Sequence, residues 1–160
     1  MGAVYLAERD DDEFLQQVAI KVTRGLLDPE RVRQFRTERQ ILAWLEHPNI
    51  ARLLDGGTTA DGLPYLVMEH VEGQTLRALL TELDRVPEEL CRHIGREVAK
   101  GLAAIHAAGV VHRDLKPENV LITADHHTVK VMDLGVARLA AETLRLSQSG
   151  AFVGSVEYAA

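Results

Sequence analysis

Residues 110–122 have the sequence VVHRDLKPENVLI, in which two apolar runs rich in β-branched residues flank an eight-residue loop at 112–119. Apolar runs on either side of a polar, proline-containing segment indicate a buried strand, a loop and a second buried strand. Within the loop, Asp114, Lys116 and Asn119 supply a base, a cation and an amide oxygen that could converge on one point. Phosphoryl transfer needs this kind of positioning and charge compensation, so the loop predicts a phosphoryl-transfer site.

The composition sets limits on the class of protein. The chain has 160 residues, of which 46% are apolar and 26% charged, and its formal net charge is −6. This composition is typical of a globular domain, and the acidity argues against broad nucleic-acid binding. No apolar run approaches the roughly 20 residues of a membrane helix, so no membrane contact is expected from this segment. The single cysteine, Cys91, cannot form an internal disulfide, which favours a cytoplasmic location.

The loop at 112–119 resembles the catalytic loop of protein kinases, and the lysine two residues after the aspartate gives it the form of the serine/threonine branch. The resemblance implies an α+β, bilobal kinase fold, with a small lobe that holds a five-stranded antiparallel sheet and one helix. It places this small lobe at residues 1–68, a hinge at 69–73 and part of a mainly helical large lobe at 74–160. The activation segment would cover residues 133–160. The likeness runs from the end of the glycine-rich loop to the start of A-P-E, so we expect a bacterial-type kinase fragment, truncated at both ends and inactive alone.

The start of the chain resembles the last part of a kinase glycine-rich loop, with Gly2 as its third glycine and Val4 over the adenine. Residues 18–22, VAIKV, resemble the strand that carries the ATP-binding lysine. The period-2 rule places Ala19 and Lys21 on one face of this strand, where a small side chain leaves room for a nucleotide beside a cation. Both residues are therefore expected to contact ATP.

A helix is predicted to begin with Asp28 as its N-cap and Pro29 at its first position. Its apolar stripe includes Glu38, and a carboxylate within a buried stripe needs a cationic partner. Lys21 is the candidate partner. The resemblance implies that this pair holds the α- and β-phosphates of ATP.

The predicted hinge supplies further ATP-binding positions by resemblance. Met68 corresponds to the gatekeeper, and the backbones of Glu69 and Val71 would bond the adenine edge. Leu121, which follows the catalytic loop, completes the predicted ATP-binding set. The remaining elements expected from periodicity are strands at 51–54 and 64–68, helices at 75–83 and 87–108, and a hairpin of strands at 120–122 and 129–132.

Asp133-Leu134-Gly135 resembles the kinase D-F-G triplet, whose aspartate binds magnesium. With Asn119, Asp133 would form the metal site, so the expected cofactors are ATP and Mg²⁺, with Mn²⁺ as a possible substitute. Arg113 and Arg138 would receive a phosphate on the activation segment. The regulatory hydroxyl residues expected in that segment and in its docking stretch are Thr143, Ser147, Ser149 and Ser155.

The resemblance implies a kinase that transfers the γ-phosphate of Mg-ATP to serine or threonine hydroxyls of protein substrates, itself included. Asp114 would accept or orient the hydroxyl proton, and Lys116 would neutralise the γ-phosphate. Two alternatives stay open: a pseudokinase scaffold that binds ATP without transfer, and a small-molecule kinase of related fold. A membrane anchor elsewhere in a longer parent protein also stays open.

Overall fold

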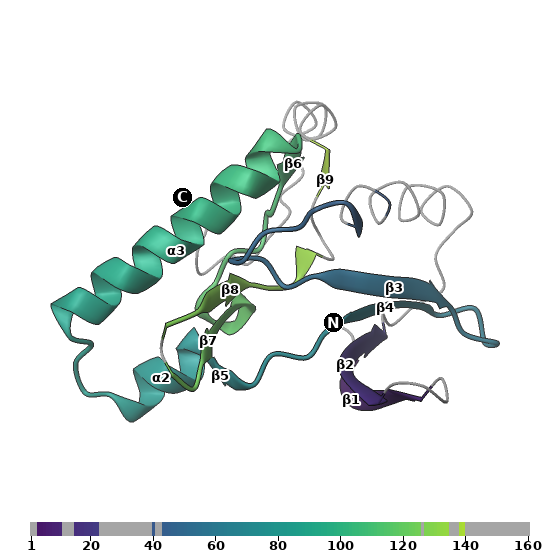
Figure 1. Cartoon of the computed structure of the whole chain (residues 1–160), viewed down its shortest axis with the longest axis horizontal. Helices are drawn as coiled ribbons and strands as arrows, with labels where there is room; N and C mark the ends of the chain where they lie inside the picture. The colour runs from purple at the N-terminus through teal and green to yellow at the C-terminus, as the bar shows by residue number, and fades with distance from the viewer. Residues whose placement is uncertain are drawn as a thin grey trace, which may run out of the picture. The chain divides into compact units, whose positions relative to one another are not determined.

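The computed structural model describes residues 3–10, 15–22, 40, 43–125, 127–134 and 138–139 (Figure 1). The chain forms two compact units. Unit 1 comprises Met1–Glu46 and Arg52–His70, and unit 2 comprises His47–Ala51 and Val71–Ala160. In the described part of the chain, no helix has both the length and the apolar character needed to cross a membrane.

Unit 1 contains an antiparallel sheet with the strand order β1-β2-β4-β3. The strands are β1 (Ala3–Asp10), β2 (Leu15–Val22), β3 (Leu53–Thr58) and β4 (Pro64–Glu69). Five strands were expected for this lobe, and the described residues provide four of them. The helix expected from Asp28 onward, with Glu38 on its stripe, lies outside the described residues.

The two faces of this sheet follow from the period of 2 along β2. Val18 and Ile20 lie on one face, and Ala19 and Lys21 on the other. Val18 is only 3% exposed, so the face that carries it is partly buried within unit 1. Lys21 is therefore on the opposite face from Val18 and Ile20.

The described residues of unit 2 combine two α-helices and a short 3₁₀-helix with two small sheets. Thr75 begins α2 as its N-cap, because its hydroxyl accepts a hydrogen bond from the Ala78 N–H at 3.2 Å. Gly109 follows α3 with a φ of +73°, the left-handed conformation that commonly ends a helix. The elements are β5 (Gly73–Thr75), α2 (Leu76–Glu82), α3 (Glu88–Ala107), β6 (Val110–Val111), the 3₁₀-helix η1 (Pro117–Asn119), β7 (Val120–Thr123), β8 (Val129–Val131) and β9 (Arg138–Leu139). β5, β7 and β8 form one antiparallel sheet, and β6 pairs with β9.

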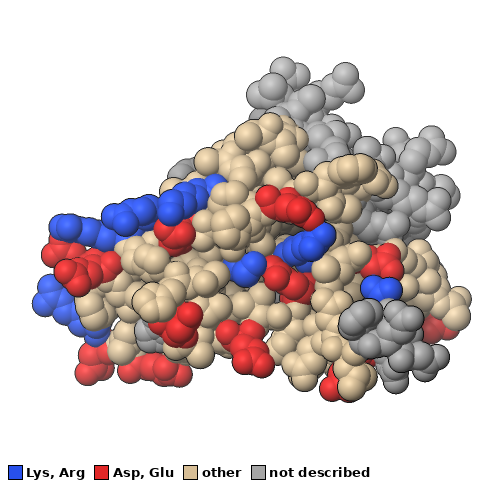
Figure 2. Space-filling view, in the orientation of Figure 1, with Lys and Arg blue, Asp and Glu red and all other residues tan. Residues whose placement is uncertain are grey.

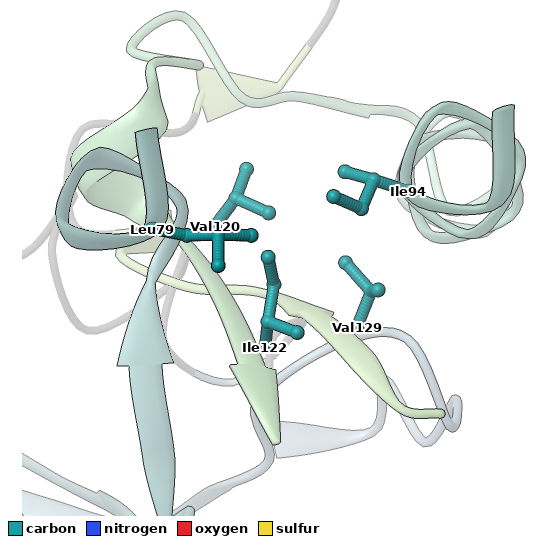
Figure 3. Close-up of a cluster of buried hydrophobic side chains, with 5 residues drawn as sticks. All are labelled: Leu79, Ile94, Val120, Ile122 and Val129. Atoms are coloured by element: carbon teal, nitrogen blue, oxygen red, sulfur yellow. The ribbon is translucent and has the colours of Figure 1, made fainter. Parts of the chain in front are cut away.

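The core of unit 2 lies where both helices pack on this sheet. Figure 3 shows the buried cluster of Leu79 from α2, Ile94 from α3, Val120 and Ile122 from β7, and Val129 from β8. Each such side chain contributes about 1.5–3 kcal/mol when fully buried. Since β7 turns alternate residues into this cluster, the loop that precedes it is anchored to the core.

The segment His47–Ala51 packs in unit 2, although its neighbours on both sides along the chain belong to unit 1. It runs parallel to β8: the Val131 N–H donates to the Asn49 carbonyl at 2.8 Å, and the Ala51 N–H donates to the Val131 carbonyl at 2.9 Å. The buried Asn49 amide also donates to Glu97 Oε2 and to the Val129 carbonyl, each at 2.9 Å. These bonds join the segment to both α3 and β8.

Basic side chains form a row along α3 (Figure 2). Arg92, Arg96 and Lys100 recur every four residues, and all three are exposed. Arg92 pairs with Glu88, and Lys100 Nζ lies 2.6 Å from Glu97 Oε1. Solvent screens exposed intrahelical pairs of this kind, so the row is a solvated helix face with modest internal pairing.

Candidate active site

His112 anchors the predicted catalytic loop. Its side chain is 2% exposed, and its Nδ1 accepts a hydrogen bond from the Asp114 N–H at 3.3 Å. Because Nδ1 accepts, Nε2 carries the proton and donates to the Met132 carbonyl at 2.9 Å. Burial lowers the pKa of His112, against smaller opposing contributions from the Met132 carbonyl and nearby carboxylates. A neutral imidazole therefore ties the loop to the segment that follows β8.

Asp114, Lys116 and Asn119 contact one another. Lys116 Nζ lies 2.7 Å from Asp114 Oδ2. The Asn119 amide donates to the Asp114 carbonyl at 2.7 Å and to Asp114 Oδ2 at 3.1 Å. The hydrogen bond to Asp114 is the main reason that the pKa of Lys116 is raised. A carboxylate thus lies between a cation and an amide donor, both of which limit its rotation.

The backbone turn of η1 makes this contact possible. Pro117 occupies the first turn of η1, where its missing N–H costs nothing. The Asn119 N–H donates to the Lys116 carbonyl at 2.9 Å, and the Met132 N–H donates to the Asn119 carbonyl at 2.8 Å. Arg77 Nε also donates to Glu118 Oε1 at 2.8 Å, which joins the turn to α2. The buried Asn119 side chain is consequently turned back toward Asp114.

Two site residues have a left-handed backbone. Arg113 has a φ of +67° and Asp133 a φ of +62°, and they are the non-glycine residues with positive φ in the described ranges. Such conformations cost of order 1–3 kcal/mol each and persist where surrounding contacts enforce them, often at functional sites. Asp133 also acts electrostatically on Lys116, raising its pKa further. The negative charge of Asp133 therefore favours the protonated form of Lys116, as that of Asp114 does more strongly.

The predicted ATP-binding residues of unit 1 share one face of its sheet. In the strand register Val4 is opposite Lys21, and Ala19 is opposite Met68. Directly opposed residues of antiparallel strands project from the same face. Val4 is 62% exposed on that face. Unit 1 therefore presents a small residue, a cation and apolar side chains on a common surface.

The hinge residues and Leu121 are placed as follows. The Glu69 N–H donates to the Arg52 carbonyl at 3.0 Å. A ligand that forms a hydrogen bond with the Glu69 backbone would therefore have to donate to the Glu69 carbonyl. Val71 is partly exposed at the start of the second part of unit 2. Leu121 projects from the face of β7 opposite to the core residues Val120 and Ile122.

Several predicted site residues lie wholly or partly outside the described part of the chain. Arg138 lies in β9, but the position of its side chain is not described. Six others lie outside the described residues: Gly2, Glu38, Thr143, Ser147, Ser149 and Ser155. Conversely, His112 was not predicted as a site residue. Val110 and His112 are two residues apart and are both buried. The period of 2 along a strand, which places alternate residues on one face, could have indicated that His112 is buried beside the loop.

Comparisons with known proteins show which proteins this chain is similar to. The family model described as protein kinase domain matches residues 1–160. Serine/threonine-protein kinase PknB of Mycobacterium leprae is 39% identical to the chain over 163 residues, which cover 99% of this chain and 26% of that protein. PknB of Mycobacterium tuberculosis is also 39% identical, over 99% of this chain and 26% of its own length. Serine/threonine-protein kinase pkn2 of Myxococcus xanthus is 38% identical, over 99% of this chain and 19% of its length.

Proposed function

Because this chain belongs to the protein kinase domain family, we propose that it carries the nucleotide-binding and catalytic residues of a serine/threonine protein kinase. The reaction would move the γ-phosphoryl group of magnesium-bound ATP to a serine or threonine hydroxyl of a protein. The chain spans about a fifth to a quarter of the length of these relatives. The proposal therefore concerns the gene product that contains these residues, and its protein substrates, itself included, are part of the proposal.

The observation that carries the proposal is the contact among Asp114, Lys116 and Asn119, with bonds of 2.7 to 3.1 Å. Phosphoryl transfer depends on positioned groups and on neutralised charge rather than on covalent chemistry by the protein. A buried histidine and a hydrogen-bonded turn hold these three residues in place before any ligand binds. Such preorganisation is what supplies electrostatic stabilisation of a transition state.

Asp114 would act on the acceptor hydroxyl. Its carboxylate is held by two donors, so a hydroxyl within hydrogen-bond reach would meet a base of restricted orientation. Positioned bases of this kind contribute typically about 10²–10⁴-fold in rate. Lys116, whose pKa is raised by the same contact, stays protonated and can neutralise charge on the transferred group.

The residues present fit a magnesium ion. Asp133 offers a carboxylate and Asn119 an amide oxygen, and Mg²⁺ prefers hard oxygen ligands with few protein donors. The Asn119 amide nitrogen faces Asp114, so its oxygen is the atom that would bind the ion. When bound, the ion would neutralise phosphate charge. Asp133 and Asn119 would hold it, and the left-handed backbone of Asp133 would set the direction of that carboxylate.

In unit 1, Lys21 would hold the α- and β-phosphates, with Glu38 as its partner. Val4, Ala19 and Met68 share its face of the sheet, and their small or apolar side chains suit contact with an adenine ring. Gly2, Glu69, Val71 and Leu121 complete the proposed ATP contacts.

Regulation by phosphorylation is a further part of the proposal. A phosphate on Ser147 or Ser149 would add about two negative charges and strong acceptor oxygens, which arginine guanidinium groups bind well. Arg113 and Arg138 are the proposed partners. Thr143 and Ser155 are the other candidate regulatory positions.

The test is intact mass after incubation of the complete gene product with Mg-ATP, beside the variants Asp114→Asn and Asp84→Asn. Asp84 is an exposed aspartate of unit 2 outside the proposed site and serves as the matched control. Wild type and Asp84→Asn should gain phosphate, whereas Asp114→Asn should gain it at least about 100-fold more slowly. Equal phosphate on Asp114→Asn would refute the assigned role.

Two other outcomes would replace the proposal. Stabilisation by ATP without any transfer, to itself or to supplied protein substrates, would indicate a nucleotide-binding scaffold. Transfer to an aminoglycoside or to choline, with none to serine or threonine peptides, would indicate a small-molecule kinase. Each result is read from the mass of the acceptor.

A further inference from the structure

An ion pair joins α2 to the loop at 112–119. Arg77 Nε donates to Glu118 Oε1 at 2.8 Å, and each of the two side chains is 44% exposed. The proposed reaction assigns no part to either residue. Glu118 is two residues from Lys116, whose contact with Asp114 supports the proposed function. The pair therefore lies next to a cation on which that reaction depends.

The topology of unit 2 brings Arg77 to this loop. β5 pairs with β7, and in that register Thr75 is opposite Leu121. Thr75 is also the N-cap of α2, so Arg77 lies in the first turn of the helix, close to the strand that follows the loop. Glu118 lies in η1, directly before β7. Since α2 and β7 both contribute to the core of unit 2, the positions of both partners are fixed by packed elements.

The carboxylate of Glu118 interacts with two cations. The hydrogen bond from Arg77 is the main reason that the pKa of Glu118 is lowered, and the charge of Lys116 also lowers it. In return, Glu118 raises the pKa of Lys116, although the hydrogen bond to Asp114 has the larger effect. Two carboxylates therefore act on one ammonium group. If Lys116 turned to Glu118, it would give up its 2.7 Å contact with Asp114.

The Arg77–Glu118 pair affects orientation more than stability. Water screens an exposed ion pair, so its contribution to the free energy of unfolding is small. A charged hydrogen bond from a planar guanidinium nevertheless limits the rotation of the carboxylate that accepts it. With Oε1 bound to Arg77, the carboxylate of Glu118 is held on α2.

We propose that Arg77 is a positioning residue for the transfer reaction, because it holds the carboxylate of Glu118 on α2 and so leaves Lys116 paired with Asp114. The inference rests on the proposed function and extends it from three loop residues to a side chain of a helix. Without Arg77, Glu118 would compete with Asp114 for the ammonium group. In a fraction of the molecules Lys116 would then be turned away from the proposed base and from the transferred group.

The first measurement is kcat of the complete gene product with a peptide acceptor at saturating ATP. Arg77→Met should lower kcat about two- to five-fold, the range over which an exposed charge pair shifts an equilibrium. Addition of Glu118→Gln to Arg77→Met should restore the wild-type kcat, because the neutral amide does not compete for the ammonium group. If the pair only links α2 to the loop, the double variant should be at least as slow as Arg77→Met, and that result would overturn the inference. The matched control is Arg92→Met, which removes an exposed Arg–Glu pair on α3 and should leave kcat unchanged.

The second measurement does not depend on phosphoryl transfer. NMR of the side-chain carboxyl carbon of Glu118, followed as pH is lowered, gives the pKa of this group. Lys116→Met should raise that pKa, and the rise should be greater in the Arg77→Met protein than in the protein that retains Arg77. The reason is that Glu118 can pair with Lys116 only when Arg77 no longer holds it. An equal rise in both proteins would overturn the inference.

The kinetic results also separate this inference from the proposed function. A wild-type protein that transfers no phosphate would overturn the proposed function and, with it, the role of Arg77 in transfer. Equal kcat values for wild type and Arg77→Met in an active enzyme would overturn the role of Arg77 alone. Arg77→Lys keeps a cation at this position but lacks the planar guanidinium, so its kcat should lie between those of wild type and Arg77→Met.

Discussion

The side-chain amide of Asn119 donates to both the backbone carbonyl and the carboxylate of Asp114, at 2.7 and 3.1 Å. One buried residue therefore fixes the backbone and the side chain of the proposed base together. Its own position depends on η1 and on the Met132 N–H that donates to its carbonyl. The orientation of Asp114 is thus a property of the whole loop, and it can be tested by changes at Asn119.

Asn119→Asp should make stability depend on pH in a new way. The introduced carboxylate would face Asp114, so its folded pKa should lie above its ordinary value of about 4. A group with a raised folded pKa stabilises the protein below its unfolded pKa and loses that contribution as pH rises through the folded pKa. Relative to wild type, the free energy of unfolding should therefore fall between about pH 4 and pH 7. Urea unfolding over this range measures it. Asn119→Ala, which should lose about 1–3 kcal/mol without this pH trend, is the control, and parallel profiles for Asp and Ala would contradict the prediction.

Lys116→Met should slow phosphoryl transfer by about 100-fold or more, since it removes a preorganised cation from the proposed site. Lys116→Arg keeps the charge and should retain more of the rate, although the guanidinium has a different geometry. Lys100→Met, on the exposed face of α3, should have the wild-type rate. The measurement is kcat with a peptide acceptor at saturating ATP. A similar rate for the Met variants at positions 116 and 100 would exclude the role of Lys116.

Gly101→Ala should destabilise the protein. A Cβ atom there would lie 2.7 Å from the Asn49 carbonyl oxygen and 3.3 Å from Val131 Cγ2, so α3 would have to move away from the segment His47–Ala51. Overpacking of this kind costs typically about 1–3 kcal/mol. Gly95→Ala on the same helix meets nothing within 4 Å and should stabilise by roughly 0.5–1 kcal/mol, because alanine is the better helix former. Thermal or urea unfolding of the two variants gives the comparison, and equal effects would show that the close approach is easily relieved.

His112 should make stability fall as the solution is acidified. Burial lowers its folded pKa below the ordinary value of 6.5, so the unfolded state binds the proton more readily. This contribution to stability is fully present above 6.5 and is lost as pH falls toward the folded pKa. His112→Phe should be less stable at about pH 7.5 but should show a flatter profile down to about pH 5. Glu97 and Glu118, whose pKa values are also lowered, act below their ordinary 4.5 and so outside this window. Identical slopes for wild type and variant would refute the assignment.

Local patterns predicted much of the fold. The helices expected at 75–83 and 87–108 correspond to α2 (Leu76–Glu82) and α3 (Glu88–Ala107). Their limits follow local sequence preferences, because Thr75 favours the start of a helix and Gly109 favours the end of one. The protein kinase family and the mixed α and β content are confirmed. The roles of the individual site residues stay predictions, although the loop does bring Asp114, Lys116 and Asn119 together.

Non-local contacts explain the differences. The strand expected at 51–54 is instead β3 (Leu53–Thr58). Asp55-Gly56-Gly57 reads as a turn in isolation, yet the strand continues because Gly57 makes room for Tyr65 from the neighbouring strand. The left-handed backbone of Arg113 likewise has no local signal, since arginine rarely adopts it.

The packing of His47–Ala51 against β8 also has a consequence for biosynthesis. Asn49 and Val129, which share a hydrogen bond, are 80 residues apart. A ribosome that adds about 5–20 residues per second needs roughly 4–16 s to cover that distance. During the first part of this interval the nascent segment has neither α3 nor β8 as a partner, and after α3 has been made it still lacks β8. The segment can pair with its partner strand only after β8 has been synthesised, by which time both flanking parts of unit 1 have been synthesised.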